Sequence, residues 1–272
     1  MKVRASDGLT LDLSERGEGP PVLLVHGLGG SGASWGEAAL TGLARRHRVL
    51  AVDLPGHGAS ADPTDSSRVS LDRVLDDLER ALDTAGVSSC PWIGYSMGGR
   101  IALGGAILRA HRLTKMVLES ASPGLPTEQE RETRRAEDEA LARGIEERGI
   151  EAWIDSWERS PLFAGRARLA PPERAAFLVQ RRGNRAASLA AWLQALGTGS
   201  QPSFWSRLGE VRIPTLLVSG ARDPKFTAIA HLMSEAIPDV RCLNVTDAGH
   251  TVHLECPADW LGAVVPFLDR PS

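Results

Sequence analysis

The sequence predicts an α/β fold, in which a mostly parallel sheet is flanked by helices and carries an inserted helical cap. Short apolar runs bounded by Gly, Pro or Asp recur along the chain, helical patterns lie between several of them, and one long stretch without strand-like runs interrupts the alternation. Continuous apolar runs of this length are typical of strands buried on both faces of a parallel sheet. Strands that alternate with helices build such sheets through right-handed crossovers.

The predicted elements begin with an antiparallel hairpin at the sheet's edge, because segments 2–5 and 9–14 flank an Asp7-Gly8 turn. Helical patterns cover residues 70–85 and 98–110. The buried strands expected in chain order are Val22–Val25, Val49–Val52, Trp92–Gly94, Met116–Leu118, Thr215–Ser219 and Arg241–Val245.

Residues 122–207 interrupt this alternation with helical, charge-rich sequence in which acids and arginines nearly cancel. We expect an α/β core over 1–121 and 208–272, with 122–207 as a cap over the sheet's C-terminal edge. Ligands of open α/β sheets bind at that edge. The segment also holds four of the seven tryptophans, Trp153, Trp157, Trp192 and Trp205.

The composition is that of an ordinary globular protein and excludes several classes. The chain has 272 residues with a net charge of −3, which argues against a nucleic-acid binder. No apolar run suits a signal-peptide core or a membrane span, so we expect a cytoplasmic protein without membrane insertion. The spacing of the three cysteines and seven histidines predicts neither disulfides nor a metal site, and we expect no cofactor. The oligomeric state stays open, a monomer included.

The strongest chemical signal is the pentapeptide Gly94–Gly98 (GYSMG), which follows a predicted strand and precedes a predicted helix. This is the G-x-S-x-G nucleophile elbow, which lifts the Ser96 hydroxyl above the sheet. The Met97 N–H, at the helix N-terminus, then points to where an oxyanion would form. Tyr95, the only tyrosine of the chain, lies beside this nucleophile.

A serine hydroxyl needs an activating histidine and an orienting acid, in the chain order Ser, Asp, His. Asp223 and His250 each follow a predicted strand and are the expected partners, with Glu119 as a competing acid. His47 and His111 are expected at the surface.

The loop Val25–Gly29 (VHGLG) after the first buried strand supplies a second oxyanion donor, the Leu28 N–H. The loop 53–60 after the next strand is expected to brace the site. Together with the elbow, the acid and the histidine, these landmarks resemble the α/β-hydrolase family.

Arg100, four residues after Ser96, is unusual because a helix N-terminus favours anions over cations. It therefore either forms a structural ion pair or awaits an anionic ligand. Further motifs resemble one subfamily, the 2-succinyl-6-hydroxy-2,4-cyclohexadiene-1-carboxylate synthases of menaquinone biosynthesis. They are Gly94–Arg100 (GYSMGGR), Glu119–Leu125 (ESASPGL), Glu130–Arg134 (ERETR) with Asp138, Trp157 before Pro161–Phe163 (PLF), Gly197–Ser203 (GTGSQPS), Asp223–Phe226 (DPKF) and Ala248–Glu255 (AGHTVHLE).

This resemblance implies an elimination rather than a hydrolysis. Such synthases expel pyruvate from 2-succinyl-5-enolpyruvyl-6-hydroxy-3-cyclohexene-1-carboxylate, and the activated serine acts as a base on the ring proton next to the succinyl ketone. The substrate is a small polycarboxylate with three carboxylates. The resemblance assigns its binding to Arg100, Arg134 and Arg181, with Tyr95 and Trp157 lining the pocket. The neighbouring arginines Arg131, Arg135 and Arg182 are expected to be solvated.

Two other functions fit parts of the sequence. A carboxylesterase or a carbon–carbon bond hydrolase of an acidic substrate would use the same Ser96, Asp223 and His250 with a water step. A fold that keeps the three residues and only binds a ligand is the second alternative. Plain esters need no arginine cluster, which favours the synthase.

Overall fold

The computed structural model describes residues 1–63 and 65–271 of the chain. An eight-stranded sheet has the order β1-β2-β4-β3-β5-β6-β7-β8, with antiparallel pairing only for β1–β2 and β2–β4. The predicted edge hairpin and mostly parallel sheet are confirmed. The strands are β1 (Lys2–Arg4), β2 (Thr10–Arg16), β3 (Pro21–Val25), β4 (Arg48–Asp53), β5 (Cys90–Tyr95), β6 (Leu113–Glu119), β7 (Thr215–Gly220) and β8 (Val240–Val245).

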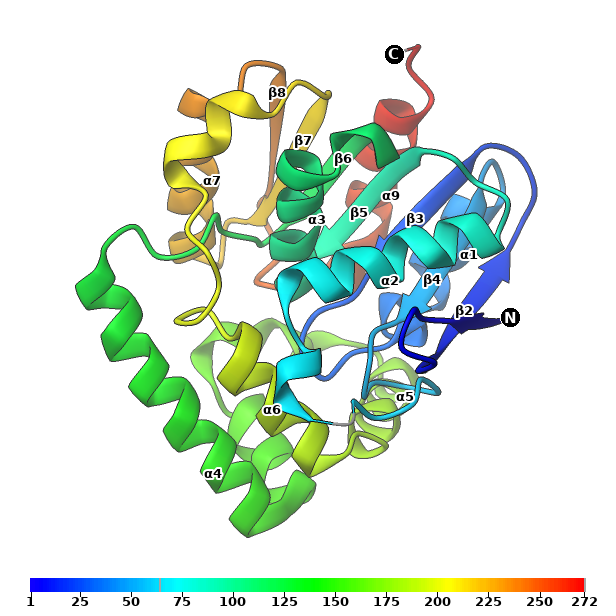
Figure 1. The fold of residues 1–272 in the computed structure, drawn as a ribbon. Coiled ribbons are helices and arrows are strands. Elements are labelled where there is room, and N and C mark those ends of the chain that lie inside the picture. The colour runs from blue at the N-terminus through cyan, green and yellow to red at the C-terminus, as the bar shows by residue number, and fades with distance from the viewer. Residues whose placement is uncertain (64, 272) are drawn as a thin grey trace.

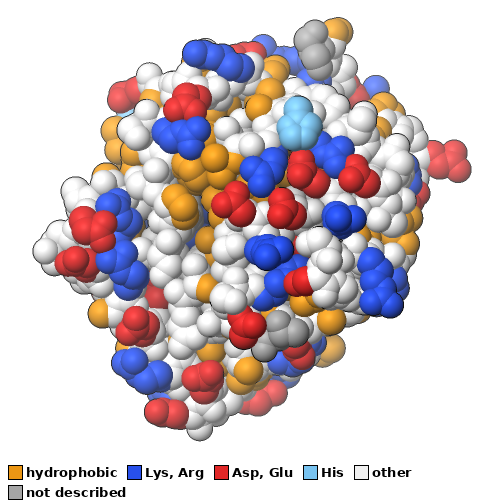
Figure 2. Space-filling model, in the orientation of Figure 1, with side chains coloured by type: hydrophobic (Ala, Val, Ile, Leu, Met, Phe, Trp, Pro, Cys, Tyr) orange, Lys and Arg blue, Asp and Glu red, His pale blue; other side chains and the backbone are white. Residues whose placement is uncertain are grey.

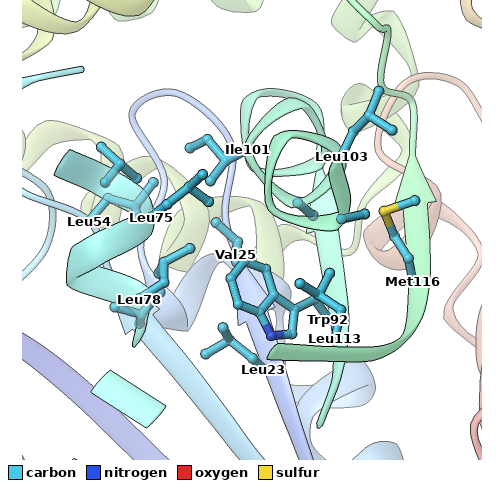
Figure 3. Close-up of a cluster of buried hydrophobic side chains, with 14 of the residues drawn as sticks. Leu23, Val25, Leu54, Leu75, Leu78, Trp92, Ile101, Leu103, Leu113 and Met116 are labelled. Atoms are coloured by element: carbon cyan, nitrogen blue, oxygen red, sulfur yellow. The ribbon is translucent and has the colours of Figure 1, made fainter. Parts of the chain in front are cut away.

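Helices cover both faces of the sheet (Figure 1). On one face, α2 (Leu71–Thr84), α3 (Met97–Leu108) and α7 (Pro224–Ala236) contribute to a common apolar cluster. Figure 3 shows its centre, where Trp92 of β5 lies among aliphatic side chains of the neighbouring strands and helices. On the other face, α1 (Glu37–Ala44) and α9 (Pro257–Leu268) complete a second cluster. The two clusters fix the strand ends that carry the site.

The local sequence explains how α2 begins and which face it buries. The Ser70 side chain accepts a hydrogen bond from the Arg73 N–H, which satisfies one of the free donors of the first turn. Leu71, Val74, Leu75 and Leu78 then recur at the spacing of one helical face, and all four are buried. The remaining short elements are η1 (Gly32–Trp35), η2 (Ser66–Arg68), η3 (Ala110–Arg112) and α8 (Val252–Glu255).

Among the described residues, the segment between β6 and β7 contains helices and no strand. Most of these helices lie below the sheet in Figure 1, whereas the last one, at residues 205–210, contacts α7. The longest helix of the segment begins with a capping box of Thr127 and Glu130 and kinks at Gly149. Figure 2 shows acidic and basic side chains mixed over this face, including over the long helix. The predicted boundaries between the core and the cap, at residues 121 and 207, remain a prediction. The helices are α4 (Glu128–Glu158), η4 (Pro161–Arg168), α5 (Pro171–Arg182), α6 (Ala186–Leu196) and η5 (Trp205–Glu210).

Two expectations about burial were wrong. The strand β8 is not buried on both faces, because it is the last strand of the sheet and Arg241, Cys242 and Asn244 are exposed. His47 is only 3% exposed, since it packs at the start of β4 with its Nε2 3.4 Å from Asp269.

No helix within residues 1–63 and 65–271 is both long and apolar enough to cross a bilayer.

Candidate active site

Ser96 stands on the sharp turn between β5 and α3, as the elbow motif predicts. Its backbone has φ 51°, a left-handed conformation that costs energy in any residue with a side chain. The flanking glycines serve a different need, because they let α3 approach the sheet. A Cβ on Gly98 would lie 1.9 Å from the Val25 carbonyl oxygen, and one on Gly94 would lie 2.4 Å from the Gly98 carbonyl oxygen. The strain is therefore carried by the serine itself.

The structure brings Ser96, His250 and Asp223 together in one hydrogen-bonded line. His250 Nε2 lies 3.2 Å from Ser96 Oγ, and His250 Nδ1 lies 2.7 Å from Asp223 Oδ2. The imidazole is 1% exposed, and this burial lowers the pKa of His250 although Asp223 acts in the opposite direction. A neutral imidazole next to a serine hydroxyl can accept its proton.

Asp223 is held by the start of α7, where its Oδ1 accepts the Phe226 N–H at 3.2 Å. The competing acid, Glu119, does not reach His250. Its Oε1 instead lies 2.8 Å from Nδ1 of His253, and both side chains are buried. The geometry thus selects Asp223 over Glu119 as the partner of His250.

The backbone N–H groups of Leu28 and Met97 are available beside Ser96. Met97 is the first residue of α3, so its N–H has no acceptor within the helix. The hydrogen bonds of the described residues leave the Leu28 N–H unused, while the next N–H, of Gly29, donates to His57 Nε2 at 3.1 Å. Burial lowers the pKa of His57 well below its usual value, which keeps this nitrogen an acceptor. Asp53 accepts the Gly32 N–H at 2.7 Å, so the loop 53–60 braces the site as expected.

Two cavities meet at Ser96, and both lie between the core and the cap. The larger has a volume of about 390 Å³ and the smaller about 30 Å³. Leu28, Ser96, Trp157 and Phe163 line both. By volume, the larger can hold a small organic molecule, whereas the smaller holds little more than one polar group.

Arg100 faces the larger cavity without a carboxylate partner. Its Nη1 donates to the Leu196 carbonyl at 3.3 Å and to the side-chain oxygen of Gln201. Among the described residues, no carboxylate lies within ion-pair distance of it. Burial lowers the pKa of Arg100 to about 10, with Asp138 acting in the opposite direction, so the guanidinium remains charged at neutral pH. The structural ion pair considered from the sequence is absent from the described part of the chain.

Arg181 occupies a similar position in the smaller cavity. It is 3% exposed, stacks over the Trp153 ring at 4.8 Å, and has no hydrogen-bond partner for Nε or Nη2. Burial lowers its pKa to about 9. Arg134 differs, because its Nε donates to Asp138 at 2.7 Å while the side chain lines the larger cavity. Each of the two cavities that Ser96 lines therefore holds an arginine, Arg100 or Arg181, that has no carboxylate partner among the described residues.

The neighbouring arginines turn away from both cavities. Arg131 and Arg135 pair with Glu128, and Arg182 pairs with Glu151. Arg182 is the most exposed of the three, whereas Arg131 keeps only 22% of its side chain in solvent and is more covered than expected.

Tyr95 lines the smaller cavity, and Trp157 stacks on Phe163 at 5.4 Å between ring centroids. Sequence reasoning missed Arg166, Phe163 and Phe177, which also line the smaller cavity. The sequence signal that could have found them is the arginine-rich η4, which has one phenylalanine within it and another in the next helix. A buried guanidinium often stacks on aromatic rings.

Comparisons with known proteins place this site in a family. The family model described as the alpha/beta hydrolase fold matches residues 20–257, which include Ser96, Asp223 and His250. A 2-succinyl-6-hydroxy-2,4-cyclohexadiene-1-carboxylate synthase from Pectobacterium atrosepticum is 32% identical over 93% of this chain and 95% of its own. A Bacillus subtilis protein assigned provisionally to the same activity is 38% identical over 98% of both chains. The chain belongs to this synthase family.

One solved structure agrees with this assignment. The structure of MenH from S. aureus superposes with a TM-score of 0.89 at 32% identity, covering 95% of this chain and 97% of that one. Family membership and the α/β-hydrolase fold confirm the resemblance inferred from the sequence motifs. For a member of the synthase family, the guanidiniums of Arg100 and Arg181 bear most directly on the substrate, because neither has a carboxylate partner among the described residues.

Proposed function

We propose that this enzyme eliminates pyruvate from 2-succinyl-5-enolpyruvyl-6-hydroxy-3-cyclohexene-1-carboxylate and forms 2-succinyl-6-hydroxy-2,4-cyclohexadiene-1-carboxylate. The observation that carries the proposal is that Arg100 and Arg181, which have no carboxylate partner among the described residues, line the two cavities that Ser96 also lines. An unpaired buried cation is costly, and a carboxylate ligand removes that cost when it binds. A substrate with several carboxylates satisfies both cations at once.

In the proposed reaction Ser96 and His250 act as one base. The ring proton next to the succinyl ketone moves to Ser96 Oγ as the hydroxyl proton moves to His250 Nε2, 3.2 Å away. The C–H electron pair forms a new double bond in the ring, the existing ring double bond shifts, and the bond to the enolpyruvyl oxygen breaks. The group leaves as the enolate of pyruvate, which takes a proton on its methylene carbon and becomes pyruvate. Asp223 stabilises the imidazolium that forms.

The negative charge that develops on the ketone oxygen needs donors that are already in place. We assign this role to the Leu28 and Met97 N–H groups, which need no rearrangement during the reaction. Loss of one such donor typically lowers kcat by about 10²–10³-fold. The hydrogen bond from Gly29 to His57 fixes the loop that carries Leu28.

The cavity volumes suggest how the substrate is divided. The larger cavity accommodates the ring with two carboxylates near Arg100 and Arg134, and Trp157 supplies an apolar wall. The smaller cavity, at about 30 Å³, suits one carboxylate group on Arg181 beside Tyr95. Paired N–H groups of a guanidinium fit both oxygens of a carboxylate, so lysine is a poor replacement at these positions. Because the substrate is a polar polyanion, we expect the enzyme to act in the cytoplasm.

The deciding experiment supplies the enolpyruvyl substrate and follows pyruvate release together with the ultraviolet absorbance of the conjugated diene. We expect equal amounts of both products, no turnover by Ser96→Ala, and a sharp loss of kcat/KM in Arg100→Ala. Arg135→Ala is the matched control, since that arginine pairs with Glu128 outside both cavities. Rapid cleavage of aryl esters without diene formation would instead support the hydrolase alternative.

A further inference from the structure

Arg166 is the one guanidinium of the site that already has a full set of partners among the described residues. It comes from η4 of the cap and is 2% exposed. Its Nη1 donates to Glu158 Oε1 at 3.0 Å, its Nε to Thr251 Oγ1 at 3.1 Å, and its Nη2 to the Tyr95 hydroxyl at 3.2 Å. A group whose nitrogens are all engaged by the protein is suited to holding parts of the site rather than capturing substrate.

The groups held by Arg166 are the direct chain neighbours of the reacting residues. Tyr95 precedes Ser96, and Thr251 follows His250. The two hydroxyls also lie 3.1 Å from each other, so Arg166, Tyr95 and Thr251 form a closed polar triangle. The triangle ties the elbow to the histidine loop, two segments that no strand pairing joins near the site.

Aromatic rings fix the plane of the guanidinium. The Arg166 Cζ lies 3.9 Å from the centroid of the Phe163 ring and 4.5 Å from that of Phe177. The planar fork presents separate N–H groups to three acceptors at once, which the single ammonium of lysine cannot reproduce. Phe163 also packs edge-on against His250 at 5.5 Å, so the same cap segment touches the imidazole directly.

We infer that Arg166 is a positioning residue, which lets the cap hold Ser96 and His250 in reacting alignment through Tyr95 and Thr251. The inference rests on the proposed function only in taking Ser96 and His250 as the reacting pair. It gives the cap a second task besides binding carboxylates. Without Arg166, the elbow and the histidine loop would lose the link that the cap provides between them.

The charge of Arg166 provides a readout that a purely structural contact would lack. The charged groups that act on His250 are Asp223 from α7, Glu119 from β6 and Arg166 from the cap. The carboxylates favour the imidazolium, and the guanidinium disfavours it. Removal of Arg166 therefore raises the pKa of His250, and the acid limb of kcat/KM moves to higher pH.

The test compares wild type with Arg166→Gln/Glu158→Gln, which removes both charges of the ion pair and leaves no unpaired carboxylate. We expect kcat to fall about 10- to 100-fold with KM within about threefold, because misalignment affects the chemical step. Thr251→Val should lower kcat less, and adding it to the double variant should cost nothing further, since both changes break the same triangle. Arg174→Gln, an exposed cap arginine, is the control that should change nothing.

Three results would overturn the inference: an unchanged kcat and pH profile, a raised KM at constant kcat, or independent effects of Arg166 and Thr251. A fluorophosphonate that labels Ser96 separates this inference from the proposed function, because labelling needs the His250 base but no polycarboxylate. Slower labelling of the double variant supports the inference even if wild type releases no pyruvate. Equal labelling rates contradict it even if wild type does release pyruvate.

Discussion

Two histidines three residues apart in the chain each pair with a carboxylate, and the two pairs have nearly the same contact distance. Nδ1 of His250 lies 2.7 Å from Asp223 Oδ2, and Nδ1 of His253 lies 2.8 Å from Glu119 Oε1. All four side chains are buried. They differ at the other nitrogen. Nε2 of His250 faces the Ser96 hydroxyl, whereas Nε2 of His253 lies 3.4 Å from the Ser34 carbonyl oxygen. A carbonyl has no proton to give, so what the second nitrogen faces decides whether such a pair can do chemistry.

Substitution of these two histidines should give the largest difference in kcat. His250→Gln should lower kcat by about 10²–10⁴-fold, the usual contribution of a positioned base. His253→Gln should keep kcat within about threefold but destabilise the fold by about 1–3 kcal/mol, because buried Glu119 loses a hydrogen-bond partner. Pyruvate release and urea unfolding measure the two quantities. A folded His253 variant with a similarly low kcat would contradict the distinction.

The same comparison applies to two adjacent arginines. Arg181 is buried and unpartnered in the smaller cavity, while Arg182 pairs with Glu151 and is 47% exposed. Arg181→Lys should lower kcat/KM by about 10- to 100-fold, the value of lost hydrogen bonds between charged groups. Arg182→Lys should leave it unchanged. If both variants keep full kcat/KM, the smaller cavity does not bind a carboxylate.

The core of the site could be predicted from sequence because its signals are local. Ser96, Asp223 and His250 each follow an apolar strand, and in a parallel sheet those strand ends meet at one edge. The burial of β8 could not be predicted in this way, because its apolar pattern does not reveal that it is the last strand. Choosing between Asp223 and Glu119 also required distances, as both follow strands.

The cap was harder to predict because its contacts depend on how separate helices pack. Arg131, Arg134 and Arg135 lie on one helix with mixed charge on every side, so periodicity does not indicate which of them faces the cavity. Arg134 was identified through the family resemblance, and Arg166 was missed. Arg166 donates hydrogen bonds to Tyr95 and Thr251, which come from distant parts of the chain. Only the tertiary structure brings these two residues to η4.

The smallest expected effect is the position of the acid limb in the pH dependence of kcat/KM. Burial lowers the pKa of His250 from its ordinary value of 6.5, since the interior disfavours the imidazolium. As the pH falls, the base is lost only when His250 takes a proton, so the limb should have its midpoint below 6.5. His111→Gln should leave the midpoint unchanged, because that side chain is 70% exposed. A midpoint at or above the ordinary value would mean that the carboxylates of Asp223 and Glu119 outweigh burial at His250, and the histidine would then resemble a charged ion-pair partner more than a resting base.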